Sequence, residues 1–100
     1  MVKTAIQNGI MKIALQGELD DNNAALIRKK LDEVLNDEQI KKVIIDMSNL
    51  DFMDSTGIGV LLGRYKKMIE RKIPAFIYAP KKNVDKVLNL SGIYKLMPKI

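Results

Sequence analysis

The sequence predicts an α/β protein, with a mixed, mostly parallel β-sheet and helices packed against it. Two observations favour this class. Met11, Ile13 and Leu15 alternate with polar or small residues at the period of a strand, and two later stretches carry apolar stripes at helical period. Short β-branched runs separate these stretches. The expected order is β-β-α-β-α-β-α-β, which favours right-handed crossovers between parallel strands.

The chain begins with a predicted hairpin. Two apolar runs, VKTAIQ and IMKIALQG, flank Asn8-Gly9, and both of these residues tolerate positive φ. A helix is expected within 18–37, where Asp20, Asp21 and Asn22 are all competent N-caps. Its apolar face consists of Ala24, Ile27, Leu31, Val34 and Leu35.

The second half alternates in the same way. The run 41–47 (KKVIIDM) is predicted to be a buried central strand, 48–54 a loop and 55–72 a helix. The apolar stripe of that helix is Ile58, Leu61, Leu62, Tyr65, Met68 and Ile69. A strand in 73–79 and a short helix in 81–92 follow, the latter with Val84, Val87 and Leu88 inward and Gly92 as its C′ stop; 93–100 is expected to hold a last short strand.

Bulk composition narrows the function. One hundred residues predict a single domain, 1–100. The chain has no apolar run of membrane length and no signal-peptide pattern, so a cytoplasmic protein is expected. Neither cysteine nor histidine occurs, which removes thiol nucleophiles, thiolate zinc sites and Ser-His-Asp triads. We therefore expect no enzyme activity, no cofactor and no metal.

The net charge of +5 does not predict a nucleic-acid binder. The lysine doublets are spread along the chain, and aromatic residues make up only 5% of it, so solvated helix faces are the better interpretation. A preference for an acidic partner stays open.

The carboxyl ends of the second and third strands are the expected location of a site, as in other parallel sheets. Here these ends are the loops 17–21 and 47–54, which carry acids and hydroxyls. The second loop leads into MDSTGIG, where Asp54 or Ser55 is expected to cap the helix. Gly57 and Gly59 weaken a helix, which suggests that something approaches the backbone closely.

Several chemistries were weighed for MDSTGIG. A serine nucleophile lacks both the G-x-S-x-G pattern and a histidine, and the glycine spacing matches no phosphate-binding loop. A phosphoaspartate at Asp46 would lie at the end of a central strand, but the first loop, where an acidic metal pair would be needed, belongs to a strand preceded by a hairpin, and the chain is short for that fold. Phosphorylation of Ser55 fits best, because a helix N-terminus tolerates the added charge through its dipole and free N–H groups.

Three segments carry a resemblance to a known family: GELDDNNAALIRKKL, VIIDMSNLDFMDSTGIGVLLGRYKKM and LSGIYKL. Together they resemble the anti-sigma factor antagonists of the STAS domain family. The resemblance implies a STAS-like fold and binding to an anti-sigma factor serine kinase, which frees a sigma factor. It further implies that the kinase phosphorylates Ser55, with Thr56 as the alternative acceptor, that this ends binding, and that a phosphatase restores it.

The partner-binding face implied here consists of Asp20, Asp21, Asn22, Met53, Asp54, Ser55, Thr56 and Gly57. Phe52 is expected in the core and Met53 on the surface, since methionine suits adaptable contacts. Members of the resembled family commonly end with a further helix, which we expect this chain to lack, so the surface it would cover is expected to be bare, or covered by a partner or a second copy in a homodimer. The alternative function is a nucleotide- or small-ligand-binding STAS module in a stress-signalling assembly.

Overall fold

The computed structural model describes residues 1–100 and contains one four-stranded sheet. The strands are β1 (Val2–Gln7), β2 (Ile10–Leu19), β3 (Lys42–Met53) and β4 (Ala75–Tyr78), and they lie in the order β1-β2-β3-β4. β1 pairs with β2 antiparallel, whereas β2–β3 and β3–β4 are parallel. The predicted α/β class with a mixed, mostly parallel sheet is therefore confirmed.

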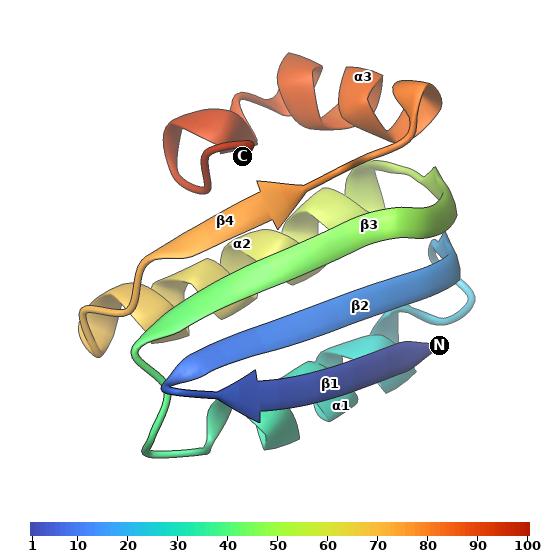
Figure 1. Ribbon diagram of the computed structural model, residues 1–100. Coiled ribbons are helices and arrows are strands. Elements are labelled where there is room, and N and C mark those ends of the chain that lie inside the picture. The colour runs from blue at the N-terminus through green and yellow to red at the C-terminus, as the bar shows by residue number, and fades with distance from the viewer.

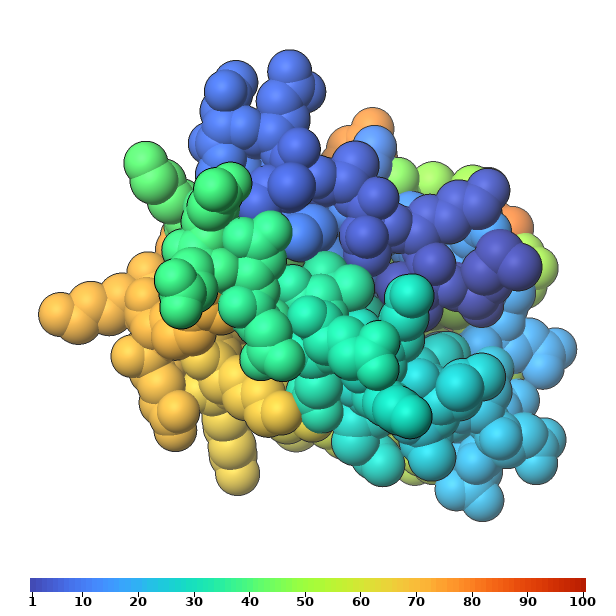
Figure 2. Space-filling view, turned by 90° about the horizontal axis from the view of Figure 1, so that it is seen from below, coloured from blue at the N-terminus to red at the C-terminus, as the bar shows by residue number.

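The helices divide into two groups around this sheet. α1 (Ala24–Leu35) and α2 (Ser55–Glu70) both lie behind the sheet in Figure 1, whereas α3 (Lys82–Ser91) lies beyond β4 at the upper edge. The core of 24 buried apolar residues lies mainly between the sheet and these helices. The front of the sheet in Figure 1 carries no helix. Figure 2 views the opposite edge, where β1 and α1 lie side by side.

The hairpin and the first two apolar patterns are confirmed. Asn8 and Gly9 have φ of 54° and 80°, as the turn requires. Met11, Ile13 and Leu15 of β2 are all buried. Four of the five residues expected on the inner face of α1 are buried, and Val34 is half-buried against them.

The two central strands are longer than the sequence predicted. β2 continues to Leu19 and β3 to Met53, where loops were expected. The two extensions pair with each other in parallel, from Gln16 opposite Asn49 to Leu19 opposite Met53, with register shifts on the way. The apolar residues Met47, Leu50 and Met53 are buried on this extension, which explains why it stays in the sheet.

The C-terminal segment forms less strand than predicted. Ile93–Lys95 is a short 3-10 helix (η1), and Lys99 makes only an isolated parallel bridge to Ile77. The Ile77 N–H donates to Pro98 O at 2.9 Å, and the Ile100 N–H donates to Ile77 O at 2.9 Å. The segment therefore lies along the outer edge of β4 and is held there by these two hydrogen bonds. Gly92 ends α3 at φ 78°, as predicted.

A polar cluster holds this segment against α3. The Tyr94 hydroxyl donates to Asp85 Oδ1 at 2.5 Å, and Lys99 Nζ lies 2.9 Å from the same oxygen. The Tyr94 hydrogen bond, followed by that of Lys99, lowers the pKa of Asp85. Burial first, and then the Asp85 carboxylate, raise the pKa of Tyr94 above its usual range.

The buried side of α2 is rotated relative to the predicted stripe. Val60, Leu61, Arg64 and Met68 face the core, whereas Leu62 and Ile69 are exposed. Arg64 is the unexpected member, because its side chain is only 9% exposed, and its Nε lies 2.9 Å from Asp32 Oδ1 on α1. Lys67 Nζ approaches the same oxygen at 2.8 Å. An ion pair between helices therefore stands where the sequence predicted only apolar packing.

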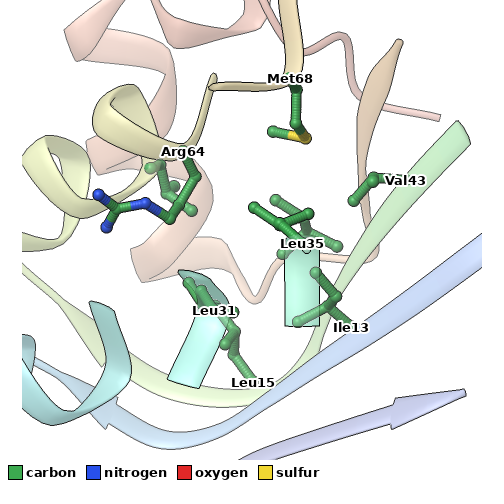
Figure 3. A pocket seen from close by; sticks show the side chains of 9 residues that line it. Ile13, Leu15, Leu31, Leu35, Val43, Arg64 and Met68 are labelled. Carbon is green, nitrogen blue, oxygen red and sulfur yellow. The ribbon is translucent and has the colours of Figure 1, made fainter. Parts of the chain in front are cut away.

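Arg64 also borders a small apolar gap in the core. Leu31 and Leu35 of α1, Ile13 and Val43 of the sheet and Met68 of α2 line this gap. In Figure 3 the guanidinium nitrogens of Arg64 point away from these side chains. The gap therefore presents carbon and sulfur atoms, and we interpret it as a packing feature of the core.

Candidate functional site

The candidate site lies where β2 and β3 end side by side. Leu19 and Met53 are paired in the sheet, so the residues that follow them, Asp20 and Asp54, leave it as neighbours. Asp20 leads toward α1 and Asp54 directly into α2. The two strand ends at which a site was predicted therefore lie side by side, several residues later than expected.

Asp54 caps α2, so the first of the two predicted caps, Asp54 or Ser55, is the one present. Its Oδ1 accepts hydrogen bonds from the N–H groups of Thr56 at 3.0 Å and Gly57 at 3.4 Å. Ser55 is then the first helical residue; it is exposed, and its hydroxyl makes no hydrogen bond within the chain. The cap occupies N–H groups that we expected to be free for a phosphate. A phosphate on Ser55 would therefore face solvent and the helix dipole.

The start of α1 is built differently from the prediction. The N-cap position is Asn23, not Asp20, Asp21 or Asn22. Asp20 Oδ1 accepts from the N–H groups of Asn22 at 3.0 Å and Asn23 at 3.3 Å, and the Asn23 side chain in turn accepts from the Asp20 N–H at 3.0 Å. These bonds fix Asp20 in place and leave Asp21 and Asn22 exposed. Asp20, Asp21 and Asn22 are thus held in one ordered turn.

The expected places of Phe52 and Met53 are exchanged. Met53 is 2% exposed and belongs to the core, whereas Phe52 is 44% exposed at the end of β3. The register shifts between β2 and β3 explain the exchange, since an irregular strand does not alternate its faces as a regular one does. Met53 is therefore unavailable to a partner, and Phe52 takes its place on the surface.

Gly57 serves the protein's own core. A Cβ on Gly57 would lie 2.4 Å from Met53 Cγ and 3.0 Å from Leu19 Cγ. The close approach inferred from the sequence is real, but the approaching atoms belong to this chain, and Gly57 is buried. A Cβ on Gly59 would meet nothing within 4 Å. Direct contact of Gly57 with a partner stays a prediction, whereas its packing against Met53 and Leu19 is present in this chain.

The surroundings of the site are acidic in a chain whose net charge is +5. Glu18, Asp20, Asp21, Asp51 and Asp54 all lie on the ends of β2 and β3 or just beyond them. From the start of α3, Lys81 Nζ lies 2.5 Å from Asp51 Oδ1, and the Asn83 side chain donates to Asp51 O at 2.7 Å. α3 thus braces the strand end that carries Asp51.

Asp46 does not lie at this site. β3 continues past it to Met53, and its carboxylate faces Lys12 Nζ at 3.4 Å on the sheet. Burial acts to raise the pKa of Asp46, but hydrogen bonds from Ser48 and then Lys12 outweigh it and lower the pKa. No group of three or more acidic side chains gathers as metal ligands would. The geometry therefore disfavours a phosphoaspartate role for Asp46.

Comparison with known proteins identifies the family. The STAS domain profile matches residues 1–100. The chain belongs to the STAS domain family. Over 90 residues it is 34% identical to the anti-sigma F factor antagonist of Paenibacillus polymyxa, covering 90% of this chain and 77% of that protein.

Solved STAS structures agree with this fold. The unphosphorylated anti-sigma factor antagonist SpoIIAA superposes with a TM-score of 0.84 at 27% identity, over 100% of this chain and 88% of that one. The phosphorylated form of the Bacillus cell fate determinant SpoIIAA superposes with a TM-score of 0.75 at 26% identity, over 100% and 91%. In this STAS domain no helix is both long and apolar enough to cross a bilayer.

Proposed function

We propose that this STAS domain is an anti-sigma factor antagonist, in which phosphorylation of Ser55 ends binding to an anti-sigma factor serine kinase. The observation that carries the proposal is an exposed serine, unbonded within the chain, at the first position of α2. Relatives named as anti-sigma factor antagonists support the partner class, and a structural neighbour described in both phosphorylated and unphosphorylated forms supports the switch.

The position of Ser55 suits a reversible charge. A phosphoserine carries about −1.5 to −2 charges at neutral pH. The N-terminal dipole of α2 favours this charge, while the Asp54 carboxylate, which already holds the Thr56 and Gly57 amides, repels it. The phosphate would project from the surface without displacing the buried Met53 or Leu19 beneath. Phosphorylation should therefore change the surface and leave the fold intact.

The proposed binding face consists of the accessible residues around Ser55: Asp20, Asp21, Asn22, Asp54, Ser55 and Thr56. A partner that fits closely over Ser55 would have to strip water from the phosphate and accommodate its volume, which disfavours the phosphorylated complex. Thr56 is half-buried, so Ser55 is the better acceptor of the two. A phosphatase acting on phospho-Ser55 would return the protein to its binding state.

Site mapping after phosphorylation tests the proposal. The protein is incubated with ATP and the anti-sigma F factor of Paenibacillus polymyxa, and the phosphate is located by mass spectrometry. We expect one phosphate, on Ser55. Ser55→Ala should abolish the modification while Thr56→Val, the matched control, keeps it. A phosphate that persists in Ser55→Ala would contradict the proposal.

Ligand binding is the rival function to exclude. The larger surface hollows lie between the end of α2, the start of β4 and the C-terminal segment, on the bare sheet face, and between the N-terminus and α1, and Ser55 lines none of them. The proposal therefore expects no rise in the unfolding temperature of the isolated protein with ATP or GTP. A rise of several degrees with either nucleotide would favour the ligand-binding alternative.

A further inference from the structure

Phe52 is an exposed aromatic side chain at the strand end that leads to the proposed switch. It is 44% exposed, whereas Leu50 and Met53 on either side of it are at most 2% exposed. It lies three residues before Ser55, at the end of the strand that leads into α2. The ring therefore exposes apolar surface at the end of β3, where its apolar neighbours are buried.

The backbone that carries Phe52 is held on two sides. Phe52 is paired with Glu18 of β2 in the sheet. Asp51, the preceding residue, accepts a hydrogen bond from Asn83 through its carbonyl oxygen and pairs with Lys81 through its carboxylate. An exposed aromatic on a fixed backbone loses little conformational freedom when a partner covers it. Aromatic anchors of this kind dominate the energy of many protein interfaces.

We propose that Phe52 is the apolar anchor of the surface that binds the anti-sigma factor kinase. The inference rests on the proposed function and adds to it the residue that supplies most of the binding energy. Phe52 lines none of the larger surface hollows, so we infer that the Phe52 ring would insert into a pocket on the partner.

Charge indicates what surrounds that pocket. Four carboxylates neighbour the ring along the strand ends, namely those of Glu18, Asp20, Asp51 and Asp54, and only Asp51 is paired with a lysine. A partner that covers the ring must also approach these acids, and an acidic or apolar rim would leave them unpaired. The complementary surface is an apolar pocket with cationic side chains at its rim.

This arrangement also explains how a phosphate could end binding to a cationic partner. Charge alone would favour the phosphorylated form at such a rim. An anchor contributes its full energy only when the ring of contacts around it excludes water. A phosphate on Ser55 carries a tightly held hydration shell to within three residues of the ring. It would keep the pocket wet, so that the anchor no longer contributes.

Binding measurements on matched variants test the anchor. The probe is the anti-sigma F factor of Paenibacillus polymyxa, whose antagonist is 34% identical to this chain. Phe52→Ala should raise the Kd about thirtyfold or more, as expected for truncation of an interface anchor. Phe52→Leu, which keeps an apolar side chain, should recover most of the affinity. The unfolding temperature of each variant is measured beside it.

Ile69→Ala is the control for removal of an exposed apolar side chain. Ile69 is 54% exposed on the same helix as Ser55, about 21 Å along its axis from Ser55. Its truncation should leave the Kd within about twofold, because a residue outside the interface has no part in binding.

The outcomes separate this inference from the function on which it rests. If the unmodified protein does not bind the probe, the proposed function fails and the anchor with it. If it binds and Ser55→Asp weakens binding, while folded Phe52→Ala binds as tightly as the unmodified protein, the function stands and the anchor is overturned. If Phe52→Ala does not fold, Phe52→Leu is compared with Phe52→Lys: equal affinities would overturn the anchor, and a selective loss in Phe52→Lys would support it.

Discussion

The first turn of α2 and its middle use polar residues for opposite purposes. At the first turn, Ser55 is exposed and its hydroxyl has no partner in the chain. Two turns later, Arg64 is buried and paired with Asp32 of α1. The paired, buried group belongs to the fold, because its charge would be costly without its partner. The exposed, unpaired group adds nothing to the fold and is free to be modified.

Substitutions in the two regions should therefore affect different properties of the protein. Substitutions in the middle of α2 should alter the free energy of unfolding, and substitutions at Ser55 should alter binding alone. Substitutions at Asp54, which caps α2, and at Gly57, which packs against Met53, should have intermediate effects on stability.

Asp32→Ala should destabilise the protein most. It leaves the Arg64 guanidinium, with a side chain only 9% exposed, without its counter-ion. We expect a loss of about 3 kcal/mol in the free energy of unfolding, measured by urea denaturation. The double variant Asp32→Leu with Arg64→Met removes both charges and should lose much less. Equal losses in the single and double variants would contradict the account.

Gly57→Ala and Gly59→Ala should change stability in opposite directions. The first places a methyl group 2.4 Å from Met53 Cγ in the core, and the second places one in open space. We expect Gly57→Ala to cost about 1–3 kcal/mol through overpacking. Gly59→Ala should add roughly 0.5–1 kcal/mol through helix propensity. Thermal unfolding of the two variants measures both changes in stability. A Gly57→Ala variant more stable than the unmodified protein would contradict the packing around Gly57.

Asp54→Ala should have a moderate effect on stability. It removes the side chain that accepts from the Thr56 and Gly57 N–H groups. Loss of such a cap costs about 1 kcal/mol, observable as a shift of the urea midpoint. Asp54→Asn keeps an accepting oxygen and is the matched control, which should lose only a fraction of that. An unchanged midpoint in Asp54→Ala would show that the cap contributes nothing.

The smallest effect on stability is expected for Tyr94→Phe, and it should depend on pH. The hydrogen bond from Tyr94 lowers the pKa of Asp85. A carboxyl group with a lowered pKa in the folded state stabilises the fold above its unfolded pKa of about 4 and loses this as the pH falls through the folded value. Tyr94→Phe should therefore be less stable than the unmodified protein near neutral pH, and the difference should shrink below about pH 4. Unfolding curves from pH 6 to pH 2 measure it; a constant difference would argue against this linkage.

Local patterns predicted much of the fold and part of the site. Asn8-Gly9 predicted the hairpin, because both residues tolerate positive φ. The apolar period of α1 predicted its buried face, and Asp54 predicted a helix start. The extension of β3 was missed because Ser48 and Asn49 look like loop residues, and only pairing with β2 keeps them in a strand. The exchange of Phe52 and Met53 follows from the same irregular pairing.

Other features depend on contacts between distant segments. An arginine at position 64 would be expected to face solvent. Its burial depends on Asp32, which lies 32 residues away on another helix. The role of Gly57 depends likewise on Leu19 of β2. No local spacing rule detects either pair. The N-cap position of Asn23 was within reach of the sequence, since asparagine directly before Ala24 is a recognised N-cap signal, but its side chain accepts from the Asp20 N–H and not from the helix.

A phosphate on Ser55 should end binding and leave the fold unchanged. The direct measurement is the affinity of the unmodified and the Ser55-phosphorylated protein for the anti-sigma F factor of Paenibacillus polymyxa, with the unfolding temperature of both forms. We predict a loss of affinity of at least about a hundredfold, on the order of 2.7 kcal/mol, with matching unfolding temperatures. Equal affinities of the two forms, or an affinity lost only because the phosphorylated protein unfolds, would contradict the account.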